Sequence, residues 1–198
     1  MNVILNVVFV LLLTSLSSVS YGGDDSAEFW QALQEGGKVV LVRHAEIDRE
    51  FGDSFLLDET CFGEKNLSDQ GKLQAQAINN LFKQYNIVID QVLSSPHCRT
   101  KDTAKLAFGA FEVAPHLRLI KALPEAQAQK NLQQTRLLIS QFKGSKDKGN
   151  LVLVTHRPNI GELIHYRLEP AEIALLEPLA TQKGEVVFDF ISKIAIVP

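Results

Sequence analysis

Three apolar runs of the chain end in residues that can bind and transfer a phosphoryl group. They are Arg43 and His44 after residues 39–42, Ser94, Ser95 and Arg99 after residues 87–93, and Thr155, His156 and Arg157 after residues 151–154. Guanidinium groups bind oxyanions with paired N–H donors. Histidine supplies a nucleophile or a proton donor near neutral pH. Two histidines and at least two arginines in one place therefore suit a phosphate better than a cation or a metal ion.

The apolar runs are predicted to be strands of one mostly parallel sheet. Continuous β-branched and aliphatic residues are typical of strands buried on both faces, and amphipathic segments between them predict a layered α/β domain. The expected strands are 38–42, 87–93, 111–114, 151–154, 185–190 and 193–197, and the expected helices are 26–35, a helix from Ser68 that includes Phe82, 95–108, 125–142 and 158–166. Since the carboxyl ends of parallel strands share one edge, the histidines and arginines are expected to meet there.

Two helix starts and one long loop adjoin these strand ends. Ser68 is a favourable N-cap, with Asp69 in the first turn of its helix. Ser95 is expected to cap a second helix with Pro96 at its first position, and the N-terminus of that helix would favour a bound anion. Residues 45–66 have no clear period and predict a long loop, which in a compact domain is usually functional.

The composition excludes several classes of protein. The chain has 198 residues, of which 45% are hydrophobic and 22% charged, with a formal net charge of -3. Such a chain can bury one sizeable core and is neither disordered nor fibrous. A nucleic-acid-binding protein normally shows an excess of basic residues. We therefore expect a globular protein that does not bind nucleic acid.

The first 20 residues differ from the rest. They contain 13 hydrophobic residues and no charged one, and the stretch 7–13 has the length of a signal-peptide core. Ser18-Val19-Ser20 fits a small-residue cleavage site. We predict a signal peptide over residues 1–20 and a single domain over residues 24–198, periplasmic or secreted, with no membrane span left after cleavage. An uncleaved membrane anchor is the alternative.

The two cysteines, Cys61 and Cys98, are too few for a fold built on disulfides. In an oxidising compartment they could pair, whereas in the cytosol they would be free thiols. The sequence leaves both states open.

Four motifs together resemble the histidine phosphatase superfamily, the phosphoglycerate mutase-like enzymes. They are Arg43-His44-Ala45-Glu46, Leu67-Ser68-x-x-Gly71-x-x-Gln74-Ala75, Ser94-Ser95-Pro96-x-x-Arg99-Thr100-x-x-Thr103-Ala104 and Val154-Thr155-His156. The chain is most similar to short exported members such as the Ais-type lipopolysaccharide core heptose phosphate phosphatases. The resemblance implies a three-layer α/β/α sandwich with a mostly parallel central sheet, a phosphoglycerate mutase-like fold.

The resemblance also implies roles for the clustered residues. His44 would attack phosphorus and form a phosphohistidine that water then hydrolyses. Arg43, Arg99 and His156 would bind the phosphoryl oxygens and stabilise the charge of the transition state. The two arginines would also disfavour a protonated His44. No metal or cofactor is expected.

The proton donor to the leaving oxygen has two candidates. Glu125 lies beyond Arg99 at about the spacing of the mutase-like enzymes and is preferred, although the glycine that usually follows that glutamate is missing. Glu46, two residues after His44, is the alternative and could also line the substrate site. Arg157 is a candidate contact for the non-reacting part of the substrate. His97 is expected at the surface or in a supporting position, like the other two remaining histidines.

The sequence therefore predicts an exported phosphomonoesterase acting on a small phosphorylated substrate, such as a phosphosugar of the envelope. Mutase activity is not expected, because Ile47-Asp48-Arg49 stands where the mutases carry an asparagine. A serine hydrolase is disfavoured because no Gly-x-Ser-x-Gly motif is present. A non-catalytic module that binds a phosphate ligand in the same fold is the remaining alternative.

Overall fold

A computed structural model describes residues 25–179 and 187–197, and the predicted signal peptide lies outside these residues. The helices are α1 (Asp25–Gln34), α2 (Asp69–Gln84), α3 (Cys98–Phe108), α4 (Glu125–Gln141) and α5 (Arg157–Ile164), with two short 3-10 helices, η1 (Pro115–Leu117) and η2 (Ile120–Ala122). The strands are β1 (Val39–Arg43), β2 (Ile89–Ser94), β3 (Glu112–Val113), β4 (Asn150–Thr155), β5 (Ile173–Pro178) and β6 (Phe188–Ile194). Within the described residues no helix is long and apolar enough to cross a membrane.

The strands form one mixed sheet in the order β3-β2-β4-β1-β5-β6. The first four strands are parallel, while β5 is antiparallel to β1 and β6 is antiparallel to β5. Strand β5 was not predicted, because alanine and leucine, which favour helices, make up most of its apolar run 173–176. The two expected C-terminal strands were also wrong. A single edge strand spans 188–194, and its side chains alternate in exposure, so polar residues interrupt the apolar pattern.

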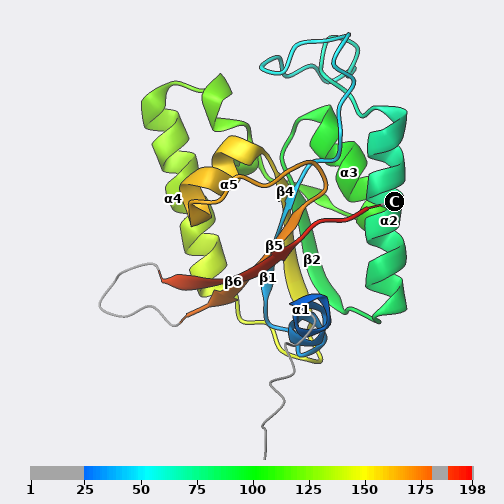
Figure 1. Ribbon diagram of the computed structural model, residues 1–198. Helices are drawn as coiled ribbons and strands as arrows, with labels where there is room; N and C mark the ends of the chain where they lie inside the picture. The colour runs from blue at the N-terminus through cyan, green and yellow to red at the C-terminus, as the bar shows by residue number, and fades with distance from the viewer. Residues whose placement is uncertain (1–24, 180–186, 198) are drawn as a thin grey trace, which may run out of the picture.

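Helices cover both faces of the sheet, which makes the predicted three layers (Figure 1). Val40 and Val42 of β1 belong to a buried cluster with residues of α1, α2 and α3. Val39 and Leu41 belong to a second cluster with residues of α4 and α5. Successive side chains of a strand point to opposite faces, so β1 contributes to both cores. This double burial explains its uninterrupted apolar sequence.

The register of the parallel strands brings the chemically active strand ends together. Arg43 of β1 lies beside Thr155 of β4, and Ser94 of β2 lies beside Val154. The three segments singled out in the sequence therefore share one edge of the sheet, as expected from a parallel arrangement.

Helix α2 begins as predicted and approaches this edge closely. Ser68 is its N-cap, and the Ser68 Oγ accepts a hydrogen bond of 3.0 Å from the Gly71 N–H. A Cβ atom at position 71 would lie 2.0 Å from the carbonyl oxygen of Glu46. Gly71 is therefore required for α2 to pack against the segment after His44.

The loop 45–66 projects beyond the strand ends (Figure 1). It is organised by its own backbone, since the Asp53 N–H donates to the Gly63 carbonyl (2.8 Å) and the Lys65 N–H donates to the Asp53 carbonyl (3.1 Å). A disulfide between Cys61 and Cys98, with Cα atoms 5.7 Å apart, ties the loop to the start of α3. The loop is thereby held beside the helix that carries Arg99.

Helix α3 begins at Cys98, later than predicted. Ser95 does not cap it, because the Ser95 Oγ is bonded instead to the ring of His156 at 2.8 Å. The Cys98 N–H donates to the carboxylate of Glu64 at 3.0 Å. The helix N-terminus expected to face a bound anion is therefore already occupied by a side chain of the loop.

Candidate active site

His44 directly follows β1 and is only 7% exposed. Its Nδ1 lies 2.9 Å from the Ala45 carbonyl oxygen, which can only accept, so Nδ1 carries the proton. The Nε2 atom is then left with a free lone pair. Burial, together with the charges of Arg99 and Arg43, lowers the pKa of His44 to about 3. His44 is thus neutral and nucleophilic at any physiological pH.

Ala45 is held in place from both sides. Its carbonyl accepts from His44, and its N–H donates to the Thr103 Oγ1 at 3.0 Å. The Thr103 hydroxyl donates in turn to the Arg99 carbonyl at 2.7 Å. This chain of hydrogen bonds fixes the segment that carries His44 relative to the helix that carries Arg99.

His156 follows β4, and its ring centroid lies 5.5 Å from that of His44. The Arg99 Nη2 lies 3.4 Å from the Nδ1 of His156, and a guanidinium only donates, so Nδ1 accepts. The Nε2 proton is then donated to the Ser95 Oγ at 2.8 Å. Burial, reinforced by His44 and Arg99, lowers the pKa of His156 well below its ordinary value. His156 is therefore also neutral.

Arg99 and Arg43 bring two cations to the same place. Arg99 is 2% exposed, and its Nη2 donates to the Ser54 carbonyl at 3.0 Å. The Arg43 Nη1 donates to the Leu168 carbonyl at 2.7 Å and lies 3.5 Å from the carboxylate of Glu169. Burial lowers the pKa of Arg99 to about 10 and also lowers that of Arg43. Both remain charged near neutral pH.

Each arginine also keeps a buried donor without a partner. The Arg43 Nε and the Arg99 Nη1 have no hydrogen bond among the described residues. Leaving a buried N–H unpaired is costly, and an oxyanion beside His44 would satisfy such groups. Two unsatisfied cationic donors next to a neutral imidazole form a site suited to a phosphoryl group.

Glu64 and His97 support this site and were not predicted to do so. Glu64 is 1% exposed and lies on the loop, where its Oε2 accepts from the His97 Nδ1 at 3.0 Å and lies 3.9 Å from the Arg99 Nη1. His97 is fully buried, and its ring centroid is 5.0 Å from that of His156. The expected surface position of His97 was therefore wrong, while the supporting position fits. Nothing in the sequence pairs Glu64 with His97, because loop and helix meet only in the folded chain.

Arg118 is a further cation that the sequence did not single out. It lies between η1 and η2, and its Nε is buried without a partner among the described residues. Burial lowers the pKa of His97, the charges of Arg99 and Arg118 lower it further, and Glu64 raises it. Arg118 thus adds to the positive potential around the histidines.

The two candidate acids lie in different surroundings. Glu125 is the first residue of α4, exposed, and its carboxylate accepts from the Gln129 Nε2 at 2.7 Å. No hydrogen bond or ion pair joins Glu125 to the histidines within the described residues. Glu46 is half-buried two residues from His44, and its backbone is held by Gln74 at 2.9 Å. Glu46 is therefore closer to the nucleophile along the chain, and its carboxylate has no partner among the described residues.

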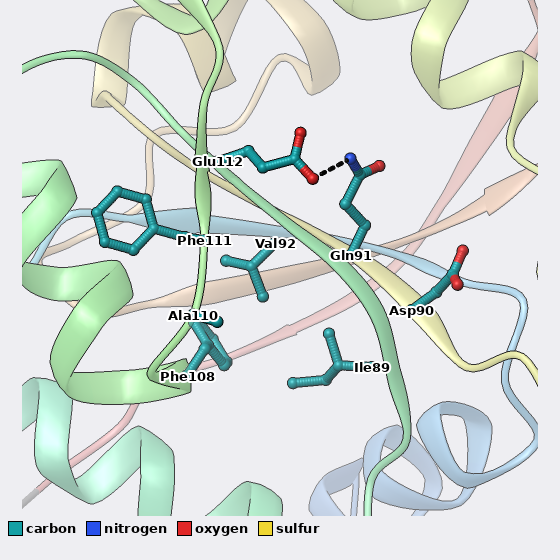
Figure 2. Close-up of a pocket in the computed structure, with 8 residues that line it drawn as sticks. All are labelled: Ile89, Asp90, Gln91, Val92, Phe108, Ala110, Phe111 and Glu112. Atoms are coloured by element: carbon teal, nitrogen blue, oxygen red, sulfur yellow. Dashed lines mark hydrogen bonds between the residues drawn. The ribbon is translucent and has the colours of Figure 1, made fainter.

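A separate hollow of about 340 Å³ lies at the β2–β3 edge (Figure 2). It is lined by residues 89–92, 108 and 110–112, and the Gln91 Nε2 donates to the Glu112 Oε1 at 3.1 Å. None of its lining residues belongs to the histidine cluster. In the part of the chain that the structure describes, no group of three or more His, Cys, Asp or Glu side chains is placed to hold a metal ion.

Comparison with known protein families gives one match, which covers part of the candidate active site. Residues 39–128 match the family model of the Histidine phosphatase superfamily (branch 1), which covers His44 and Arg99. This stretch of the chain is therefore similar to the histidine phosphatase superfamily. No curated protein matches the chain.

Three solved structures share the fold over most of the chain. The protein histidine phosphatase SixA complexed with tungstate is 15% identical with a TM-score of 0.54, covering 80% of this chain and 96% of its own. Phosphoglycerate mutase from Thermus thermophilus is 17% identical with a TM-score of 0.54, covering 81% and 99%. The product of the open reading frame Rv3214 from Mycobacterium tuberculosis is 19% identical with a TM-score of 0.55, covering 78% and 95%. The domain thus has the phosphoglycerate mutase-like α/β fold.

Proposed function

We propose that this protein is an exported phosphomonoesterase that works through a phosphohistidine on His44. The observation that carries the proposal is the contact of 2.9 Å between the Nδ1 of His44 and the Ala45 carbonyl oxygen. The His44 proton is held on Nδ1 by this carbonyl, so the Nε2 lone pair is available next to unpaired donors of Arg43 and Arg99. A nucleophile kept neutral beside two cations is suited to attack a phosphate dianion.

The reaction has two balanced steps. In the first, the Nε2 of His44 bonds to phosphorus while the ester P–O bond breaks, and a carboxylic acid gives its proton to the leaving oxygen. In the second, a water oxygen bonds to phosphorus, the N–P bond breaks, and the same carboxylate takes the proton from water. Arg43 and Arg99 bind the phosphoryl oxygens throughout, which stabilises the charge of the loose transition state.

His156 contacts Arg99, Ser95 and His44 in this site. Its Nδ1 accepts from Arg99, its ring packs at 5.5 Å from His44, and its Nε2 proton is held by Ser95. We assign it to the phosphoryl site, where it orients Arg99. Glu46 and Glu125 are the two candidate acids.

The proposed compartment and substrate rest on different observations. The N-terminal apolar segment favours export, and the disulfide between Cys61 and Cys98 is typical of an oxidising compartment such as the periplasm. The Ais-type resemblance favours an envelope phosphosugar among the small phosphorylated substrates. The missing asparagine of the mutase motif favours hydrolysis over phosphoryl transfer to a second sugar acid.

The decisive experiment measures hydrolysis of an aryl phosphate by the purified protein without added metal. The wild type should turn over, His44→Ala should reduce turnover to background, and His116→Gln, outside the cluster, should retain it. Rapid-quench mass spectrometry should find a phosphoryl group on His44 during turnover. Full activity in His44→Ala overturns the proposed chemistry. Tight phosphate binding with no turnover in the wild type would instead establish the binding-module alternative.

A further inference from the structure

A second hollow lies beside the candidate active site, between η2 and α5. Its volume is about 540 Å³, and its ionisable lining residues are Lys121, Arg157, Glu162, His165 and Arg167. We call it the basic groove. Nothing in the reaction at His44 requires these residues, so the groove calls for an explanation of its own.

The basic groove borders the phosphoryl site at Arg43. Arg157 immediately follows His156, and its positive charge is close enough to lower the pKa of Arg43. On the other side, the Arg43 Nη1 donates to the carbonyl of Leu168, the residue after Arg167. The groove therefore adjoins Arg43 through two segments, the start of α5 and the residues that follow this helix.

The charges of the groove are unbalanced. Within the described residues, no hydrogen bond or ion pair engages the side chains of Lys121, Arg157 or Arg167. Elsewhere in the molecule, a surface lysine does find a carboxylate, as in the pair of Lys72 with Asp69 at 2.8 Å. Glu162 is the one carboxylate that lines the groove, and no ion pair joins it to the three cations. Three unpaired cations facing one hollow repel one another, and an anion between them relieves that repulsion.

The carboxylate nearest the border does not neutralise the groove either. Glu169 lies 3.5 Å from Arg43 and is directed to that residue. The guanidinium of Arg136 on α4 donates to the Glu162 carbonyl at 2.6 Å, which adds a cation next to α5. The local charge is therefore positive although the whole chain carries -3.

We propose that the basic groove binds a second acidic group of the substrate, either a carboxylate or a second phosphate. The preferred substrates are then phosphomonoesters that carry another anionic group within reach of the scissile phosphate. This inference rests on the proposed function, because it names the class of substrate that the proposed active site would bind.

Binding of non-hydrolysable phosphonates tests the groove without requiring turnover. Calorimetry would compare propylphosphonate with 3-phosphonopropionate and propane-1,3-bisphosphonate, and with longer members of each series to vary the reach. One of the doubly acidic ligands should bind the wild type about tenfold more tightly than its neutral-ended counterpart. The series with the larger gain in affinity, carboxylates or bisphosphonates, identifies which acidic group the groove prefers. The gain should shrink as the salt concentration rises.

Variants then locate the effect. Arg157→Gln combined with Arg167→Gln should reduce the gain to about twofold or less, while the affinity for propylphosphonate changes little. Lys105→Gln on α3, outside the groove, is the matched control and should retain the full gain. Arg167→Gln alone, at an exposed position, keeps the test valid if the double variant folds poorly.

The outcomes separate the two proposals. Equal affinity of the wild type for singly and doubly acidic phosphonates overturns the groove, as does a gain that survives in the double variant. Failure to hydrolyse an aryl phosphate overturns the phosphatase function alone, because phosphonate binding does not depend on it.

Discussion

Glu64 and His97 are joined by a hydrogen bond of 3.0 Å between Oε2 and Nδ1, and both side chains are buried. The same carboxylate oxygen accepts from the Cys98 N–H, while its Oε1 accepts from the Asp58 N–H at 3.0 Å. One loop carboxylate thus caps α3, holds a histidine against His156 and lies beside Arg99. The loop 45–66 is therefore a structural part of the candidate site.

Glu64→Gln should destabilise the protein by about 2 kcal/mol, because a buried charge-assisted acceptor is replaced by an amide that also presents donors. Urea unfolding followed by circular dichroism would measure the loss. Glu50→Gln, an exposed carboxylate on the same loop, should change stability by less than about 0.5 kcal/mol. If the two variants are equally stable, the capping role of Glu64 is wrong.

Gly71→Ala should also destabilise, although alanine favours an isolated helix by about 1 kcal/mol. The added Cβ would lie 2.0 Å from the Glu46 carbonyl oxygen, so α2 or the segment after His44 must shift, at a cost of about 1–3 kcal/mol. Asn80→Ala, at an exposed position of α2, is the control and should gain about 0.5 kcal/mol. A stabilised Gly71→Ala would contradict the close approach. Its phosphatase activity should fall as well, since the nucleophile segment is displaced.

The buried histidines predict a loss of stability in acid. His44 has a folded pKa of about 3, below its unfolded value of about 6.5, so the folded state binds fewer protons between these values. Stability is full above pH 6.5 and falls as the pH drops toward 3, by about 1.4 kcal/mol per pH unit for each such histidine. His156, with its pKa lowered in the same direction, adds to the slope.

Unfolding free energies at a series of pH values would check this slope. His44→Gln should make the slope shallower by about one proton, because the glutamine cannot titrate. Asn80→Ala, an exposed substitution that changes no titratable group, should leave it unchanged. An identical slope in the wild type and in His44→Gln would show that burial does not hold His44 neutral.

The disulfide between Cys61 and Cys98 closes a segment with a sequence separation of 37 residues. Constraint of the unfolded chain predicts a stabilisation of about 4 kcal/mol. Replacing both cysteines with serine should remove most of it, and a reductant should destabilise the wild type but not this variant. The Michaelis constant for an aryl phosphate should rise at the same time, because the loop that supplies the Ser54 carbonyl to Arg99 becomes looser. A disulfide-free variant with wild-type stability would refute the role of the bridge.

The general acid can be identified by comparing Glu46→Gln with Glu125→Gln. Loss of the true acid should reduce kcat strongly for an alkyl phosphate, whose leaving oxygen needs a proton, and only weakly for a nitrophenyl phosphate. The other variant should lower neither rate by more than a few-fold. If both variants behave alike on the two substrates, neither carboxylate donates the proton.

The strand ends and the cap of α2 could be predicted from the sequence, because both depend on residues that are close together along the chain. Residues 39–42 and 151–154 form uninterrupted apolar runs, and a parallel sheet must place the residues after such runs on one edge. Ser68 caps α2 through a contact only three residues long. The start of α3 was misplaced because the Ser95 hydroxyl, a good local cap, is bonded to a residue 61 positions away.

By itself, the sequence determined the layered α/β fold and the convergence of Arg43, His44, Arg99 and His156, and it predicted a phosphate-binding site there. Only the tertiary structure decided that Glu64 caps α3, that His97 is buried, and that Cys61 reaches Cys98. Those contacts join a loop without periodicity to a distant helix, so no local pattern encodes them. The net charge of -3 likewise conceals a positive site, because charge is arranged by folding rather than by composition.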